Sequence, residues 1–445
     1  MIQALRNAMT LPDLRRKLLY TLLILIMYRL AAHVPVPGVD QTQLQQILEG
    51  TGGSAGLLGV LDLLSGGAVA NFSILANGVQ SYITASIIMQ LLQPIIPQLE
   101  RLAEEGEAGR RKLNQWQYYI TIPLSLLQSY GWVRYLNASS ESPVLPHFGF
   151  SPAENILPTI SVLVAMMAGT MFAIWLGDLV SEQGIGNGLS LIIFSGIVAR
   201  VPANLQRIWF QGQTMEGGGT GMSVLMLGVF LAITAITMFV IVVVQEGERR
   251  IPVQYGKRVR GTKMYGGGST HIPLKVNTAG MIPLIFAQSI LTFPAIIAQF
   301  FASSESVAAS QFAQGVMDFF TPQGVWYGPM LFLAVVGFTY FYTDIMIQQQ
   351  DLPGSLQRQG GFIPGIRPGR RTAEYINSVY KRITLVGALF LGGVAVLPYV
   401  VDLFMQTSVL LITASGLLIV VGTVLDTMRQ LEAQLLMRHY EGFIK

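Results

Sequence analysis

The sequence contains no cysteine and carries little charge. With 0 cysteines among 445 residues, disulfides, thiolate metal sites and cysteine nucleophiles are excluded. Only 12% of the residues are charged and 51% are hydrophobic, whereas soluble domains are about 25% charged. This composition indicates an integral membrane protein.

The apolar segments also lack acidic or basic residues near their centres. Arg29 lies close to the end of the first segment, Asp178 at the edge of another, and Asp426 at the end of the last. Ion-coupled carriers and intramembrane hydrolases depend on ionisable groups within the membrane, so both classes are disfavoured. The 4 histidines are scattered without metal-ligand spacing. We therefore expect no catalytic residue, no metal and no cofactor.

Apolar runs long enough to cross a bilayer recur along the chain, since about 20 helical residues span the hydrocarbon core. Ten spans are predicted, at 18–36, 73–95, 116–136, 155–177, 186–203, 222–245, 276–300, 325–346, 383–400 and 404–426. Basic residues gather in alternate loops, most of all at 246–275 and 348–382. By the positive-inside rule these loops and both termini are cytoplasmic.

Ten spans with both ends on one side divide into two halves of five, which must be inverted relative to each other. The expected fold is an all-α integral membrane protein with ten transmembrane helices in two inverted five-helix halves. Its expected parts are a cytoplasmic N-terminus (1–17), an N-terminal half (18–203), an external linker (204–221), a C-terminal half (222–426) and a cytoplasmic tail (427–445). Aligning Gly78 with Gly280 sets Ile83 over Ile285, at the start of the second span of each half.

The stretch 61–94 is unusual for a membrane segment. Its first part is apolar, marked by glycine and too short to cross a bilayer, which is typical of a re-entrant segment sheltered by protein. Its second part is long enough to cross but carries Asn77, Gln80, Ser81 and Thr84 among apolar residues. One face of this span is therefore expected to meet protein or water.

Two basic loops carry more charge than topology requires. In the loop 246–275, Ile, Val and Tyr alternate with charged residues, which predicts a folded protrusion. A cationic protrusion suits an anionic partner such as ribosomal RNA or an acidic protein surface, although orienting the spans and binding lipid headgroups is the simpler interpretation. In the loop 360–371, prolines and glycines predict a rigid turn that presents Arg367.

Several motifs, in order along the chain, resemble the SecY family, the central subunit of the bacterial protein-conducting channel. They are Leu-Ser-Gly-Gly (64–67), Ser-Tyr-Ile-Thr-Ala-Ser-Ile-Ile (81–88), Glu-Gly-Glu-Ala-Gly-Arg-Arg-Lys (105–112), Gly-Ile-Gly-Asn-Gly (184–188), Gly-Glu-Arg-Arg-Ile-Pro-Val-Gln-Tyr (247–255), Ser-Thr-His-Ile-Pro-Leu-Lys-Val-Asn (269–277) and Phe-Ile-Pro-Gly-Ile-Arg-Pro-Gly (362–369). The resemblance runs from the basic N-terminus to about residue 440.

The resemblance implies a clamshell of two halves with an hourglass pore, a short re-entrant plug helix after the first span and a lateral gate between the second and seventh spans. The plug corresponds to about 57–70, and includes Leu61, Asp62, Leu63, Leu64, Ser65, Gly66 and Gly67. The apolar pore ring corresponds to Val79, Ile83, Leu189, Ile193, Ile285 and Ile419. The polar cluster of the gate corresponds to Thr84, Gln128 and Asn277.

The resemblance also implies partners. The basic loops resemble those that dock the ribosome or the motor ATPase SecA, with the contacts assigned to Arg249, Arg250, Lys257, Arg258, Arg260, Arg367, Arg370 and Arg371. The small membrane subunits SecE and SecG, signal peptides, translocating polypeptides and membrane lipid complete the implied set. The implied location is the bacterial cytoplasmic membrane, with a plastid membrane left open.

Some positions depart from the family pattern. Asn77, Gln80 and Ser81 stand where Leu, Met and Pro are expected, and Asp62 stands where Asn is usual in the plug. One alternative function is a polytopic small-solute secondary transporter, which inverted halves and broken spans would suit but large cationic loops would not. An intramembrane enzyme is a third class, for which no nucleophile and base stand together.

Overall fold

The computed structural model describes residues 9–40, 68–69, 71–93, 95–138, 143–145, 148–149, 156–214, 219–255, 258–260, 263–265, 269–302, 307–320, 324, 326–350, 352–405 and 413–441. Each of the ten predicted spans contains a helix. These helices are α2 (Pro12–Ala31), α5 (Gln80–Leu92), α7 (Glu107–Ala138), α8 (Ile156–Gln183), α9 (Gly188–Thr214), α10 (Thr220–Glu246), α11 (Ile282–Ala302), α13 (Tyr327–Gln350), α15 (Arg370–Met405) and α16 (Thr413–Glu441).

Three shorter helices lie between the long ones: α6 (Pro97–Glu104), α12 (Val307–Phe320) and α14 (Leu352–Gln359). Among the described residues, five helices are both long and apolar enough to cross a membrane, namely α8, α9, α10, α13 and α15. Several helices extend past the predicted boundaries: α9 continues to Thr214, well into the predicted linker 204–221, and α15 begins at Arg370, within the predicted loop 348–382.

The second predicted span is shorter as a helix than the sequence suggested. Residues 71–79 form turns, and α5 begins only at Gln80. Phe72 and Gly78 both have positive φ, of 39° and 50°, a conformation that cannot propagate a right-handed helix. The chain therefore enters the interior as turns before α5 begins.

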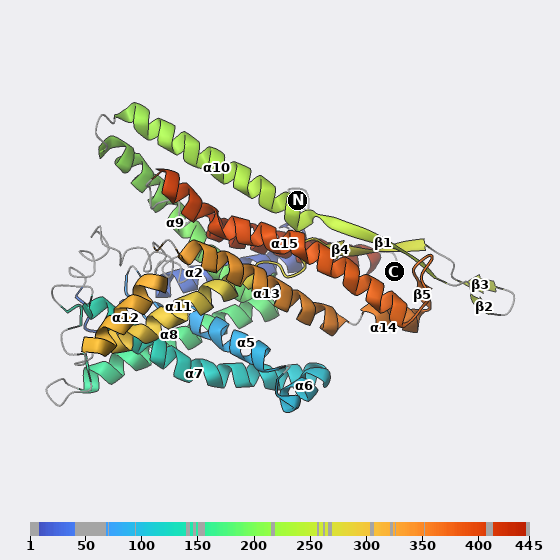
Figure 1. Cartoon of the computed structure of the whole chain (residues 1–445), viewed down its shortest axis with the longest axis horizontal. Helices are drawn as coiled ribbons and strands as arrows, with labels where there is room; N and C mark the ends of the chain where they lie inside the picture. The colour runs from blue at the N-terminus through green and yellow to red at the C-terminus, as the bar shows by residue number, and fades with distance from the viewer. Residues whose placement is uncertain are drawn as a thin grey trace.

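Strands occupy the loops at one end of the molecule, so the fold is mostly helical rather than purely α. Strand β1 (Glu248–Tyr255) pairs antiparallel with β4 (Ser269–Lys275), and β5 (Gly361–Phe362) adds to its other edge. Strands β2 (Arg258–Arg260) and β3 (Lys263–Tyr265) form a second antiparallel pair. In Figure 1 these strands lie with α14 beyond the same ends of the long helices, and α12 lies at the opposite end.

Three of the four hydrophobic clusters in the described part of the chain organise this architecture. The largest draws buried side chains from α2, α8, α9, α10, α11, α13, α15 and α16 and from the turn before α5. A second joins α7 and α8 to the segments around residues 36 and 69. A third holds the sheet against α14 and α15 through Ile251, Val253, Leu274, Leu356 and Ile376, among others. The described residues of the basic loop 246–275 are therefore folded into strands, as its alternating pattern predicted, and β1 and β4 contribute to this cluster.

Candidate functional site

The six residues assigned to the pore ring lie together in the largest hydrophobic cluster, and we call them the pore cluster. Val79, Ile193, Ile285 and Ile419 are buried there, and Ile83 and Leu189 pack against them partly exposed. They come from the start of α5 and from α9, α11 and α16, two elements in each half of the chain. All six are aliphatic, so the cluster is an apolar patch to which both halves of the chain contribute.

The unexpected polar residues at the start of α5 bond across to neighbouring helices. Gln80 donates through Nε2 to Ser289 Oγ on α11 at 2.7 Å. Ser81 donates through Oγ to Gln128 Oε1 on α7 at 2.6 Å. Asn77, in the preceding turn, donates through Nδ2 to Ser129 Oγ of α7 at 2.7 Å. These three departures from the family pattern thus each form a buried hydrogen bond to a neighbouring helix, and the fourth, Asp62, lies outside the described residues.

The three residues assigned to the lateral gate do not bond to one another. Thr84 Oγ1 donates to the Gln80 carbonyl of its own helix at 3.0 Å. Gln128 Oε1 accepts from Ser81 Oγ of α5 at 2.6 Å. Asn277 Nδ2 donates to the Gly280 carbonyl at 2.9 Å, which closes the turn before α11. The polar link between α5 and α11 is therefore carried by Gln80 and Ser289.

The arginines assigned to docking lie at the end of the molecule that carries the sheet. Arg249 and Arg250 on β1, Arg367 in the turn after β5, and Arg370 and Arg371 at the start of α15 are all exposed. Arg250 pairs with Glu248 at 2.7 Å and Arg370 with Glu374 at 3.1 Å. The other three form no ion pair within the described part of the chain. Lys257 falls outside the described residues. Arg258 and Arg260 are the first and last residues of strand β2.

The turn that carries Arg367 is anchored on both sides. Ile363 is buried and Ile366 packs partly exposed in the cluster beneath the sheet. After the arginine, Thr372 Oγ1 donates to the Arg367 carbonyl at 3.0 Å. An exposed cation on a fixed backbone can bind an anionic partner without paying the ordering cost of a mobile loop.

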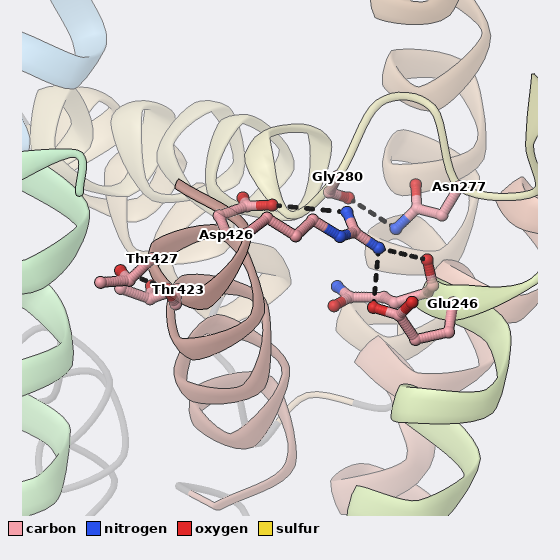
Figure 2. A network of polar contacts seen from close by, with 8 residues as sticks. Glu246, Asn277, Gly280, Thr423, Asp426 and Thr427 are labelled. Carbon is pink, nitrogen blue, oxygen red and sulfur yellow. Dashed lines mark hydrogen bonds and ion pairs between the residues drawn. The ribbon is translucent and has the colours of Figure 1, made fainter. Parts of the chain in front are cut away.

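Arg429 of α16 fastens the end of α10, directly before β1, to α16. Figure 2 shows Glu246 at the end of α10 and Asp426 on α16, which both contact this arginine. Its guanidinium donates to Glu246 Oε1 at 2.7 Å and to the Gln245 carbonyl at 3.4 Å, at the last residues of α10. Asp426, one turn back on α16, lies 3.8 Å from the same guanidinium. Arg429 therefore caps the C-terminus of α10 from another helix, where the terminal carbonyls favour positive charge.

The sequence analysis did not identify Ser289 or Arg429 as site residues. Ser289 is one hydroxyl within an apolar helix, and nothing in its spacing marks it. Arg429 follows the last span, where a basic residue satisfies the positive-inside rule without any special role. Only the packing of α11 against α5, and of α16 against α10, gives them partners.

Comparison with known proteins assigns the family. The SecY family model matches residues 73–428. This chain belongs to the SecY family. It is 42% identical to the protein translocase subunit SecY of Streptomyces galbus over 453 residues, and 43% identical to that of Halalkalibacterium halodurans over 448 residues, with both chains covered completely in each case. The chain is a multi-pass membrane protein with the SecY channel fold.

Solved structures agree on the fold at lower identity. One, on the plug domain of the SecY protein, matches with a TM-score of 0.60 at 17% identity, covering 94% of this chain and 91% of the other. Another, Sec61 in the canine ribosome-channel complex from the endoplasmic reticulum, matches with a TM-score of 0.55 at 18% identity, with the same coverage. None of these matches supports the small-solute transporter.

The SecY plug assigned from the sequence lies mostly outside the described residues. This holds for Leu61, Asp62, Leu63, Leu64, Ser65, Gly66 and Gly67. Ala68 and Val69, at the end of the predicted plug, are buried in two different clusters. The Ala68 carbonyl accepts from the Ser73 amide at 2.9 Å, so this end of the segment is fixed just before α5. Among the described residues, no group of three or more His, Asp or Glu is placed to hold a metal ion.

Proposed function

We infer that this chain is the protein-conducting subunit of a translocase, moving unfolded signal-bearing polypeptides across a membrane and releasing transmembrane segments sideways into it. The observation that carries this is the pore cluster, in which aliphatic residues from both halves meet beside the contact of α5 with α11. Branched aliphatic side chains yield around a passing chain, and when closed they hinder ions by dewetting.

The pore and the gate follow from that arrangement. The pore cluster forms the constriction, with the plug of about residues 57–70 next to it. Lateral release occurs between α5 and α11, which contact each other beside the cluster, with Thr84, Gln128 and Asn277 near the opening. Apolar signal segments pass into lipid there because the two helices face each other through few polar contacts.

The proposed location is a bacterial cytoplasmic membrane, with both termini in the cytoplasm. Support comes from the basic loops 246–275 and 348–382, since positive charge is retained on that side. The N-terminal half is 18–203 and the C-terminal half 222–426. The sheet, α14 and the exposed arginines then form the cytoplasmic face, and the region 204–221 lies outside.

Partner proteins are proposed to supply the driving force for transport. No reaction is assigned to its side chains, so directional force comes from the motor ATPase SecA, from a translating ribosome or from the membrane potential. The exposed arginines suit the acidic surface of the motor or ribosomal RNA. SecE and SecG are proposed as the small membrane subunits that complete the channel.

Protein transport into proteoliposomes tests this function. The chain is reconstituted with SecE, SecG, SecA and ATP, and a signal-bearing precursor is scored by protection from protease. We expect protection with the native chain and with Arg16→Glu, an exposed arginine on α2 outside the docking loops. Arg367→Glu should lose most transport, because it reverses the charge at the anchored turn.

Two results would contradict the proposal at different points. Equal transport by Arg367→Glu and the native chain would remove the docking role of that turn. Uptake of a radiolabelled small solute, with no precursor protected for any variant, would favour the transporter over the channel.

A further inference from the structure

Helix α12 is short, and one of its faces packs onto the rest of the chain. Its 14 residues are too few to cross a bilayer, and this length is typical of interfacial or re-entrant segments. The helix lies at the end of the molecule opposite the sheet and in contact with α11 (Figure 1). Ala313 is only 1% exposed, and Phe320 packs partly exposed against the largest hydrophobic cluster. This inner face holds α12 against the protein.

A second apolar stripe on α12 is turned away from the protein, and we call it the outer stripe. Its residues recur at intervals of three or four and so share one face of the helix: Ala308, Phe312, Gly315 and Phe319. All four are exposed, Phe312 by 76% and Phe319 by 42%. The two phenylalanines stand two turns apart, roughly 10 Å along the helix axis. Apolar side chains gathered on an exposed face mark a surface that a membrane or a partner covers.

The polar side chains of α12 form a narrow stripe between the inner face and the outer stripe. Gln311, Gln314 and Asp318 recur at the same helical spacing, and all three are exposed. Asp318 is the only charged residue between 307 and 320, and that range contains no Lys or Arg. The helix therefore has no cation that could attract an anionic partner. It suits an apolar environment over most of its circumference and water along one side.

Exposed aromatic residues flank α12 along the chain. Phe301, near the end of α11, is 55% exposed, and Trp326, directly before α13, is 65% exposed. Both helices belong to predicted spans of this membrane protein, so these two residues stand where a span reaches the membrane boundary. Aromatic rings, those of Trp above all, favour that boundary. Because α12 connects two such points, it lies at the membrane surface.

We propose that α12 is an interfacial helix whose outer stripe inserts into the lipid leaflet opposite the sheet, with the polar stripe turned to water. Such helices bury their apolar face about 5–10 Å into the boundary between headgroups and acyl chains. Lipid is favoured over a protein partner because the side chains of the outer stripe offer no hydrogen-bonding group and lie between two aromatic boundary residues. The inner face of the same helix contacts α11, so α12 anchors the outer end of α11 to the bilayer.

Fluorescent labels on single cysteines test this orientation. The chain has 0 cysteines, so each introduced cysteine is its only thiol: Phe312→Cys and Gly315→Cys on the outer stripe, and Gln311→Cys and Gln314→Cys on the polar stripe. Each is labelled with an environment-sensitive nitrobenzoxadiazole dye in the full chain, reconstituted with cysteine-free SecE and SecG in phosphatidylcholine vesicles. Two quenchers are compared: iodide on both sides of the membrane, and a phosphatidylcholine that carries a nitroxide near the top of its acyl chain.

We expect the lipid quencher to act several-fold more strongly on labels at Phe312 and Gly315 than on labels at Gln311 and Gln314, and iodide to show the reverse order. Equal iodide quenching at all four positions would show that the outer stripe faces water and would overturn the proposal. Protection of the label at Phe312 from both quenchers would also overturn it, because a protein would then cover the stripe.

The lipid headgroup provides a further check. Replacing part of the phosphatidylcholine by phosphatidylglycerol should leave the quenching pattern unchanged, because residues 307–320 include no cation. Lipid quenching that appears only with phosphatidylglycerol would contradict anchoring by apolar side chains.

A matched pair of substitutions tests the anchor itself. Phe312→Asp places a negative charge on the outer stripe, and Gln311→Asp places the same charge on the neighbouring polar stripe. Both positions are exposed, so neither change disturbs buried packing. With the dye at Gly315, lipid quenching should fall several-fold with Phe312→Asp, because a charge is disfavoured in the apolar layer, and should be unchanged with Gln311→Asp. Equal quenching in both variants would reject the anchor. Neither experiment measures transport, so the result is independent of the proposed channel function.

Discussion

Gly78 and Gly280 lie in opposite halves of the chain and hold the same place in the structure. Their φ angles are 50° and 67°, and each stands two residues before the first residue of a helix, α5 or α11. The residues after them, Val79 and Met281, are both buried in the largest cluster. The alignment of these glycines in the sequence thus corresponds to a repeated turn at the entry to the pore cluster.

This turn predicts the effect of adding one methyl group. Gly280→Ala should lower the free energy of unfolding by about 1–2 kcal/mol, because an L-residue with positive φ is strained. No clash contributes, since nothing lies within 4 Å of the added carbon. Gly228→Ala on α10 is the control, with the same open surroundings, and should be neutral or slightly stabilising because alanine favours helix. Thermal unfolding in detergent measures both, and equal effects would show that backbone conformation is not the cause.

The Arg429 contact predicts that reversing its charge modestly lowers the stability of the protein, and that reversing its partner as well restores part of it. Arg429→Glu should destabilise the protein by about 1 kcal/mol, since partly exposed ion pairs contribute little but reversal also places a negative charge at the C-terminus of α10. Adding Glu246→Arg should recover part of that loss in thermal unfolding. If the double variant is as unstable as the sum of the two single ones, the pair observed at 2.7 Å makes no contribution.

Truncation within the pore cluster should open a leak. Ile419 has 0% of its surface exposed, and Ile419→Ala should destabilise the protein by about 2–5 kcal/mol through the cavity it leaves. It should also raise the resting ion conductance of the reconstituted channel, because a wider ring dewets less readily. Leu436→Ala, on the same helix but 64% exposed, should change neither. Planar-bilayer recordings measure the resting conductance of both variants. A leak from Leu436→Ala but not from Ile419→Ala would show that the constriction lies elsewhere.

We predict that loosening the turn that carries Arg367 weakens partner docking even when no charge is changed. Ile363→Ala leaves Arg367 in place but removes the buried side chain that fixes its turn. Binding of SecA to the reconstituted channel should weaken several-fold, because the partner must then order a mobile loop. Val386→Ala, exposed on the membrane part of α15, is the matched control. Unchanged binding by Ile363→Ala would show that charge alone matters.

Much of the architecture could be predicted before the structure was known. Low charge and long apolar runs predicted the helices, and each predicted span contains one. The alternation of apolar and charged residues predicted that the loop 246–275 is folded, and the structure has strands β1 to β4 there. The extent of α5 was predicted less well, because hydropathy does not detect the turns at 71–79, whose backbone is set by glycine and by packing.

The contact between α5 and α11 shows most clearly what the sequence could not predict. The sequence marked Gln80 as polar at an apolar position but gave it no partner, and it did not single out Ser289 at all. A lone serine in an apolar helix fits many environments equally well, so its spacing carries no signal.

Composition and the length and number of the apolar runs determined the membrane class and predicted the two-half plan, and the resemblance to the SecY family implied which aliphatic residues form the pore cluster. What only the tertiary structure decided is which side chains pair across helices. Gln80 with Ser289 and Arg429 with Glu246 are separated by about 200 residues, and such contacts form only where packing places two helix faces together.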